Sequence, residues 1–233
     1  MLASAVLLSG GLDSAVLVAE EAAHGDRDVQ PIYVSVGLAW ERAERQVVAR
    51  MLDSGALGPR VRPLASLSVD MRDVYPHTHW AVEGRPPAYH TPDEDVYLPG
   101  RNIVLLGKAG VYCAAARLDR LVLGTLDHNP FPDATPAFRD AMAAALSMGL
   151  AHPLTIAAPY STLSKAEVIR RGLALSVPLE LTLSCMSPVV ESGGATHCGV
   201  CSKCRERHDA FVEAGVQDPT TYTDPTFVRA GVR

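Results

Sequence analysis

Short apolar runs alternate with longer, helix-like stretches along most of this chain, and this alternation limits the possible folds more than any other feature of the sequence. The apolar runs have the length of strands and lie at residues 5–8, 31–36, 61–64, 121–123 and 154–157. Helical stretches are expected at about 13–23, 40–52, 102–117 and 136–150. Such alternation predicts crossover units and an α/β fold with an open parallel sheet and helices on both faces. Pro63 interrupts the third run, which is unfavourable in a strand.

The hexapeptide SGGLDS, which begins at Ser9, joins the first apolar run to the first helical stretch. Backbone N–H groups and the positive end of a helix dipole converge at such a turn, which therefore suits an anion. Gly10 and Gly11 let the backbone approach a phosphate closely, and the hydroxyls of Ser9 and Ser14 add donors. Asp13 starts the helix and can cap it or hold Mg²⁺. The spacing fits neither a Walker-type loop nor a G-x-G-x-x-G fingerprint. A tight turn with a capping aspartate is the alternative.

Four of the five cysteines have a spacing typical of a metal site. They are Cys185, Cys198, Cys201 and Cys204, in the stretches SCMSP and HCGVCSKC. These thiolates can close a tetrahedral Zn²⁺ site with every position filled, so the zinc would be structural. An iron–sulfur cluster also uses four cysteines and is the alternative. His197 could replace one thiolate, whereas Cys113 lies in an Ala-rich helix and is most simply a buried apolar residue.

Length, charge and composition indicate an ordinary globular protein. The chain has 233 residues, a net charge of −5 and 48% hydrophobic residues, enough to bury a full core. Apolar runs are too short for a membrane span, and the N-terminus lacks the pattern of a signal peptide. We therefore expect a cytoplasmic protein without a membrane partner, and the acidic charge disfavours nucleic acid as a partner.

Two segments depart from the alternating pattern. Residues 66–100 hold several prolines, histidines and acidic residues with little periodicity, and so long a connection is usually functional, for example a lid. From Ser184 onward the chain is rich in cysteine, glycine and proline and is not expected to continue the sheet. We therefore predict an α/β domain over 1–183 and a small zinc-binding region over 184–233.

Several motifs together resemble one known family. SGGLDS is the signature of the PP-loop ATP pyrophosphatases, in which this turn holds the pyrophosphate of ATP. With LPGRN at 98–102, the helix start STLSKAEV and the run SC…CGVCSKCRER, the chain resembles the 7-cyano-7-deazaguanine synthase family of queuosine precursor biosynthesis over nearly its whole length. The resemblance implies a fold like that of the adenine nucleotide alpha hydrolases. It also implies ATP-dependent conversion of 7-carboxy-7-deazaguanine to an amide and then a nitrile with ammonia, one structural Zn²⁺, Mg²⁺ bound with ATP, and a homodimer.

The resemblance implies roles for individual residues as well. The expected ATP-binding residues are Leu8, Ser9, Gly10, Gly11, Leu12, Asp13, Ser14 and Lys165. A capping-box pattern places Lys165 in the first turn of a helix, where PP-loop enzymes commonly carry a lysine that reaches the phosphates. Arg101 can hold a carboxylate or phosphate through paired hydrogen bonds, and Asn102 can cap the following helix. Lys165, Asp13 and Arg101 are the expected catalytic residues. Otherwise Lys165 is a solvated lysine and LPGRN a simple turn.

Two stretches depart from the family pattern on the expected substrate side. After the second strand the family carries Tyr-Gly-Gln-Arg-His, where this chain has VGLAW and keeps Gly37. After the fourth strand, FPDATPAF keeps Asp133 but has Phe131 for a tyrosine and Ala134 for a cysteine. Asp133 could still accept hydrogen bonds from a heterocycle, and Phe131 could stack on it. The expected substrate-binding residues are Arg101, Asn102, Phe131 and Asp133.

These departures leave other functions open. The chain could be a divergent PP-loop ligase that amidates a different carboxylate. A tRNA-modifying PP-loop enzyme that transfers sulfur would need a free catalytic cysteine, for which Cys113 alone remains outside the predicted zinc site. A zinc-knuckle module would bind nucleic acid through basic residues near the cysteines, namely Lys203, Arg205, Arg207 and His208.

Overall fold

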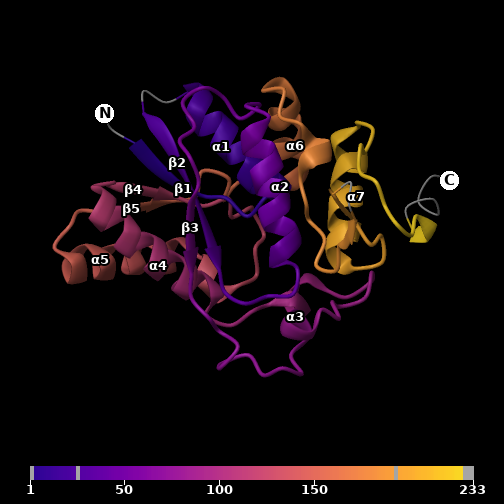
Figure 1. Ribbon diagram of the computed structural model, residues 1–233, viewed down its shortest axis with the longest axis horizontal. Helices are drawn as coiled ribbons and strands as arrows, with labels where there is room; N and C mark the ends of the chain where they lie inside the picture. The colour runs from indigo at the N-terminus through magenta and orange to yellow at the C-terminus, as the bar shows by residue number, and fades with distance from the viewer. Residues whose placement is uncertain (1–2, 25–26, 192–193, 228–233) are drawn as a thin grey trace.

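A computed structural model describes residues 3–24, 27–191 and 194–227 (Figure 1). Within them, five parallel strands form one sheet in the order β3-β2-β1-β4-β5. The strands are β1 (Ala3–Leu7), β2 (Asp28–Ser35), β3 (Ala65–Ser68), β4 (Arg120–Val122) and β5 (Thr155–Ala157). This topology confirms the α/β fold that the alternating pattern predicted. β1 and β2 are buried along most of their length because helices cover both faces of the sheet.

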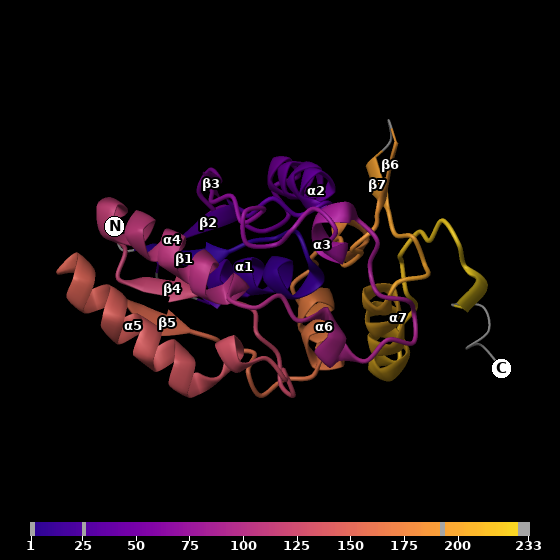
Figure 2. The same cartoon turned by 90° about the horizontal axis from the view of Figure 1, so that it is seen from below.

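Figure 2 shows helices on the two faces of the sheet. They are α1 (Leu12–His24), α2 (Glu41–Asp53), α4 (Arg101–Ala116), α5 (Pro136–Leu150) and α6 (Lys165–Ala174). α4 and α5 pack on one face, and α1, α2 and α6 lie on the other. Right-handed crossovers require this division, because the chain moves outward from β1 to β3 and then returns across the sheet to β4 and β5. In the described part of the chain, no helix combines the length and apolar character of a membrane span.

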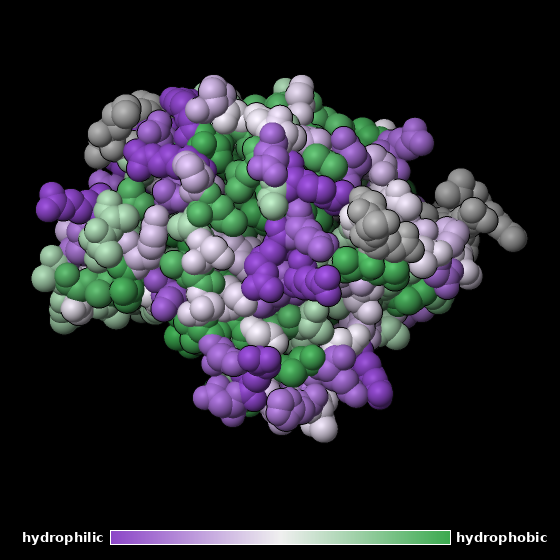
Figure 3. Space-filling model, viewed as in Figure 1, coloured by the Kyte–Doolittle hydropathy of each residue, from purple (hydrophilic) through white to green (hydrophobic). Residues whose placement is uncertain are grey.

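The surface of α2 illustrates how the helices are oriented. Its buried side includes Ala43, Val47 and Val48, which face the core. Its outer side is hydrophilic and lies in the middle of the face shown in Figure 3. An apolar stripe on one side and charges on the other are what a helix needs to cover a sheet.

The third strand lies further along the chain than its apolar run predicted, so the prediction of a strand at 61–64 is wrong. Val61 makes a single isolated bridge with Val29, and Pro63 has no N–H to donate to a neighbouring strand. The Pro63 carbonyl oxygen instead accepts a hydrogen bond of 2.8 Å from the side-chain amide of Gln30. Because β3 is an edge strand with alternate residues exposed, it does not need an apolar sequence.

The C-terminal part of the chain forms a small unit beside α6. β6 (Val189–Glu191) and β7 (Gly194–Thr196) form a separate antiparallel pair, and α7 (Ser202–Ala214) packs against α6. Neither strand joins the parallel sheet, as the change in composition at Ser184 predicted.

The carboxyl ends of β1 and β4 mark where a ligand is expected. β1 pairs with β2 on one side and with β4 on the other, so the chain leaves these two central strands in opposite directions and opens a crevice. The long connection predicted at 66–100 begins only after β3, because residues 66–68 pair with β2, and it reaches this end of the sheet. Its short helices α3 (Trp80–Glu83) and η1 (Asp93–Val96) contribute Trp80 and Val96 to the wall of a cavity there.

Candidate active site

The turn after β1 is built by glycine and serine, as predicted for SGGLDS. Gly10 has a φ of 83°, and a Cβ at this position would lie 3.1 Å from the Val48 side chain, so the turn packs directly on α2. The Ser14 hydroxyl donates to the Gly11 carbonyl oxygen over 3.0 Å and accepts the N–H of Ser9 over 3.3 Å. The turn is therefore held in shape by its own side chains at the N-terminus of α1, where an anion is favoured.

Lys165 lies in the first turn of α6 and reaches back to the same turn. The predicted capping box is confirmed: the Ser164 hydroxyl accepts the N–H of Glu167 over 3.2 Å, and the Glu167 carboxylate accepts the N–H of Ser164 over 2.7 Å. The Lys165 ammonium lies 3.2 Å from Asp13 Oδ2 and also contacts the carboxylate of Glu206 from α7. Asp13 itself is the second residue of α1, so it does not start the helix as predicted.

The charges around Lys165 depend on one another. Burial alone would lower the pKa of Lys165, but the carboxylates of Asp13 and Glu206 outweigh it and keep the ammonium charged. Burial raises the pKa of Asp13, partly opposed by Lys165. Burial also disfavours the charged form of Glu206, yet Lys165 and Lys203 together lower its pKa to about 2. Beside the SGGLDS turn, Lys165 and Lys203 thus lie with the carboxyl groups of Asp13 and Glu206, and these groups can exchange partners when a phosphate enters.

Removing the cap of α6 should destabilise the helix that carries Lys165. We expect Ser164→Ala to lower the free energy of unfolding by about 1 kcal/mol, because the N–H of Glu167 loses its acceptor. Urea unfolding measures this loss, and Ser161→Ala in the preceding turn controls for removal of a hydroxyl outside the cap. Equal stability of the two variants would contradict the prediction.

Arg101 begins α4, and its neighbour Asn102 is held by Asp133 from the short helix η2 (Pro132–Ala134). The N–H of Asn102 donates to Asp133 Oδ2 over 3.0 Å, and its side-chain amide donates to the Asp133 carbonyl oxygen over 3.1 Å. The prediction that Asn102 caps the helix is wrong, because the chain enters α4 through Gly100 at a φ of 78° and Asn102 falls inside the first turn. Asp133 supplies the acceptor instead.

One cavity of about 420 Å³ brings these groups together. The predicted residues on its wall are Leu8, Ser9, Gly11, Leu12, Asp13, Ser14, Lys165, Arg101, Asn102, Phe131 and Asp133. Gly10 belongs to the same turn but faces α2. Two stacked aromatic pairs also contribute to the wall: Trp40 with Trp80 at 5.9 Å between ring centroids, and Tyr97 with Phe131 at 5.0 Å. The cavity can therefore accept a phosphate at one part and a planar ring at another.

The cavity also contains a half-buried carboxyl group, that of Glu44, which the sequence analysis missed. Glu44 of α2 accepts a hydrogen bond of 2.8 Å from the Tyr33 hydroxyl and another from the indole of Trp40. Burial raises the pKa of Glu44 to about 7, although the hydrogen bond from Tyr33 and the charge of Arg101 oppose the rise. The sequence did hold a signal for this position. Glu41 and Glu44 lie in the first turn of α2, directly after β2, and ligands bind beyond the carboxyl ends of the strands in such sheets.

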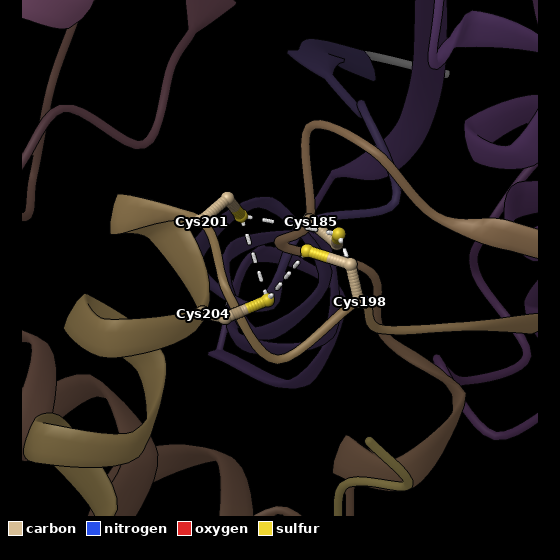
Figure 4. Close-up of side chains that lie close together, drawn as sticks. All are labelled: Cys185, Cys198, Cys201 and Cys204. Carbon is tan, nitrogen blue, oxygen red and sulfur yellow. Dashed lines mark hydrogen bonds between the residues drawn. The ribbon is translucent and has the colours of Figure 1, made fainter. Parts of the chain in front are cut away.

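The four predicted metal ligands come together at the start of α7 (Figure 4). Their sulfur atoms lie within 4.8 Å of one another, with 3.5 Å between Cys201 and Cys204 and 4.0 Å between Cys185 and Cys201. Four sulfurs at about 2.3 Å from a tetrahedral ion would be about 3.8 Å apart. The backbone N–H of Cys198 donates to the Cys185 sulfur over 3.3 Å, as expected around a thiolate. The cluster could therefore bind a single metal ion.

His197 lies beside this cluster and is used for another contact. Its Nε2 accepts the backbone N–H of Ser184 over 3.0 Å. Burial lowers the pKa of His197 to about 3, so the ring is neutral and can act as this acceptor. The ring therefore holds the segment before Cys185 in place.

The arginines of α7 point inward. Arg207 is fully buried and donates to the Thr182 hydroxyl and the Leu179 carbonyl oxygen, both over 2.8 Å. Arg205 donates to the carbonyl oxygen of Tyr89 over 2.9 Å. These contacts bind α7 to the rest of the protein, which argues against an exposed basic surface for nucleic acid.

Cys113 is completely buried in the middle of α4, as predicted. Burial raises the pKa of its thiol to about 12. A reactive cysteine needs an accessible thiolate, so this residue does not support sulfur transfer.

Comparison with known proteins identifies the family of this chain. Residues 3–215 match the family described as "Queuosine biosynthesis protein QueC". A 7-cyano-7-deazaguanine synthase from Anaeromyxobacter dehalogenans is 38% identical over 228 residues, covering 93% of this chain and 94% of that protein. The synthase of Azoarcus sp. is 34% identical (93% and 95% covered), and that of Methanopyrus kandleri is 32% identical (96% and 100% covered). Because the match includes both the sheet and the cysteine cluster, the chain belongs to the QueC family of queuosine biosynthesis proteins.

Proposed function

We propose that this protein is an ATP-dependent ligase that converts 7-carboxy-7-deazaguanine to 7-cyano-7-deazaguanine with ammonia as nitrogen donor. The observation that carries the proposal is one cavity in which the SGGLDS turn and Lys165 lie beside Arg101 and two aromatic pairs. Such a cavity can align a triphosphate with a planar carboxylate. The three relatives reported above are named for this activity, and each match covers at least 93% of the chain.

The reaction needs two activations, because a carboxylate and an amide both have poor leaving groups. First, a carboxylate oxygen attacks the α-phosphorus of ATP, pyrophosphate leaves, and an acyl adenylate forms. Ammonia then attacks the acyl carbon, AMP leaves with the C–O bonding electrons, and one proton is released. Next, the amide oxygen attacks a second ATP in the same way. Loss of AMP and of both amide protons leaves the nitrile.

The protein supplies alignment and charge stabilisation rather than a nucleophile. In this proposal the backbone amides of the turn and the hydroxyls of Ser9 and Ser14 bind the phosphates. Lys165 is held charged at the edge of the same turn and neutralises the leaving pyrophosphate. Arg101 binds the substrate carboxylate through paired hydrogen bonds. Asn102 and Asp133 keep the N-terminus of α4, and therefore Arg101, in position.

Asp13 is the proposed ligand for the Mg²⁺ bound with ATP. Its Oδ1 is buried and has no hydrogen-bond partner among the described residues, while Oδ2 contacts Lys165. Mg²⁺ prefers oxygen ligands, and this carboxylate oxygen at the SGGLDS turn is available as one. An ion held there would offset the negative charge of the phosphates.

Zn²⁺ is the proposed metal of the cysteine cluster, with a structural role. The sulfur spacing supports a single tetrahedral ion, whereas an iron–sulfur cluster distributes its thiolates over several iron atoms and needs more room. Four thiolates leave no open position for a substrate or water.

Product analysis by mass spectrometry tests the proposed reaction. Zinc-loaded protein is incubated with ATP, Mg²⁺, ammonium and 7-carboxy-7-deazaguanine, and we expect the nitrile together with AMP and pyrophosphate. An amide as the final product would mean that the second activation is absent. Folded, ATP-binding protein that yields neither product would contradict the deazaguanine assignment and favour a ligase for another carboxylate.

The location and assembly of the enzyme are part of the same proposal. We expect a cytoplasmic homodimer, because the family implies both. Light scattering of the purified protein measures the assembly, and a monomeric mass at micromolar concentration would contradict the dimer.

A further inference from the structure

The proposed substrate presents a donor edge that the phosphate turn and Arg101 cannot bind. The ring of 7-carboxy-7-deazaguanine carries an N–H and an amino group side by side, as any 2-amino-4-oxopyrimidine ring does. A carboxylate can accept both hydrogen bonds in parallel, in the same way that it accepts the two N–H groups of an arginine. The cavity therefore needs a carboxylate that faces a planar ring.

Most carboxylates on the cavity wall already serve other groups. Asp133 accepts two hydrogen bonds from Asn102, Asp127 accepts the backbone N–H of His128, and Asp13 and Glu206 pair with Lys165. Glu41 accepts the backbone N–H groups of Val36 and Gly37, over 2.7 and 3.1 Å, and the hydroxyl of Ser35. These carboxyl groups therefore hold nearby backbone and side chains in place or pair with Lys165 beside the SGGLDS turn.

Glu44 differs from them because its donors are aromatic side chains of the cavity wall. Tyr33 donates from β2 over 2.8 Å, and Trp40 donates from the residue before α2. Both rings line the cavity together with Glu44, and Trp40 stacks on Trp80 from the long connection, with ring planes 16° apart. The two donors orient the carboxyl group beside an aromatic surface, which is the surroundings that a planar heterocycle requires.

We infer that Glu44 is a specificity-determining residue that binds the N–H and amino edge of a 2-amino-4-oxopyrimidine ring, with Tyr33 and Trp40 fixing its orientation. The inference rests on the proposed function, because it assigns a residue to the substrate of that reaction. Arg101 lies close enough to Glu44 to affect its charge and would bind the carboxylate of the same substrate. Glu44 and Arg101 would then bind opposite ends of the substrate.

This assignment predicts how substrate binding depends on pH. The groups that face Glu44 are Tyr33 from β2, Trp40 and Glu41 at the start of α2, and Arg101 from α4. The ionised carboxylate accepts both donors of the ring, whereas the protonated acid would place its own proton against one of them. Since the pKa of Glu44 is about 7, the KM for the substrate should fall as the pH rises through this value.

The test measures KM for both substrates in Glu44→Gln. We expect the KM for 7-carboxy-7-deazaguanine to rise by about 10- to 100-fold, the effect of losing hydrogen bonds to a charged acceptor. The KM for ATP should change less than twofold, and the pH dependence near 7 should disappear. Glu44→Asp keeps the charge and should recover part of the affinity. Arg42→Gln, on the exposed side of the same helix, is the matched control and should behave as wild type.

An analogue without the 2-amino group provides the second measurement. Wild type should bind it at least about 10-fold more weakly than the substrate, and Glu44→Gln should lose this preference. Equal preference in both proteins would overturn the inference, as would a rise in the KM for ATP alone, which would place Glu44 against the base of ATP. Thermal melting of each variant confirms that it is folded.

The same proteins separate this inference from the proposed function. If wild type forms no product, calorimetry with the substrate and its analogue shows whether the ring is still bound. Binding that depends on Glu44 would support the inference without the reaction, and absence of binding would overturn both.

Discussion

Lys165→Met is expected to lower kcat/KM by about 100- to 1,000-fold, the usual effect of removing one preorganised group that stabilises transition-state charge. The ammonium lies 3.2 Å from Asp13 and contacts Glu206, so it is already fixed at the phosphate turn before ATP binds. Its loss leaves the half-buried carboxylates of Asp13 and Glu206 without their shared cation, which should also weaken ATP binding. Pyrophosphate release in the presence of the carboxylate substrate measures the effect.

The exposed Lys108 of α4 offers the matched control. Lys108→Met removes the same charge outside the cavity and should keep wild-type activity. Lys165→Arg keeps the charge but changes its shape, and we expect it to restore only part of the rate. A Lys165→Met enzyme with normal kcat/KM would remove this lysine from the proposed mechanism.

Cys204→Ser is expected to abolish stoichiometric zinc binding and to lower the melting temperature by about 10 to 30 °C. A structural zinc contributes about 10–16 kcal/mol of binding free energy in isolated zinc fingers. Losing about half of that free energy would lower the melting temperature of a protein of this size by the stated amount. The sulfur of Cys204 lies 3.5 Å from that of Cys201 and 3.9 Å from that of Cys198, so Cys204 is one of the four proposed ligands. Metal analysis and thermal unfolding measure both effects.

Cys113→Ala is the control for the loss of a buried thiol. It should keep its zinc and cost about 1–2 kcal/mol, as is usual for a small core substitution. Chelation of wild type should reproduce the Cys204→Ser melting temperature. If Cys204→Ser retains one zinc per chain and melts with wild type, the cluster is not the structural metal site proposed.

The cysteine cluster and the active site are linked through α7. Cys201 precedes this helix, Cys204 lies in its first turn, and Glu206 from the same helix contacts Lys165. Loss of the metal should therefore disturb the charges at the phosphate turn as well as the fold. Cys185 also lines the cavity, so a metal bound by the cluster would support the proposed site directly as well as through α7.

Local patterns predicted a large part of this protein. The strand-to-helix turn at SGGLDS, the capping box before Lys165 and the grouping of four cysteines each depend on residues close together in sequence, or on a chemistry that few residue types perform. The alternation of strands and helices predicted the parallel sheet because periodicity and burial decide these elements locally. The third strand failed this reasoning, since an edge strand need not be apolar.

The tertiary structure alone decided which side chains share the cavity. Glu44, Glu206 and Trp80 come from α2, α7 and the long connection, and their approach to Lys165 or Trp40 depends on how those elements pack. The role of Asn102 changed for the same reason, because Asp133 reaches it from a segment about thirty residues away. The sequence by itself determined the fold class, the SGGLDS turn at the end of β1 and the grouping of the four cysteines. Long-range packing decided which charges and aromatic surfaces face the cavity, because burial and neighbouring groups set the pKa and direction of each side chain.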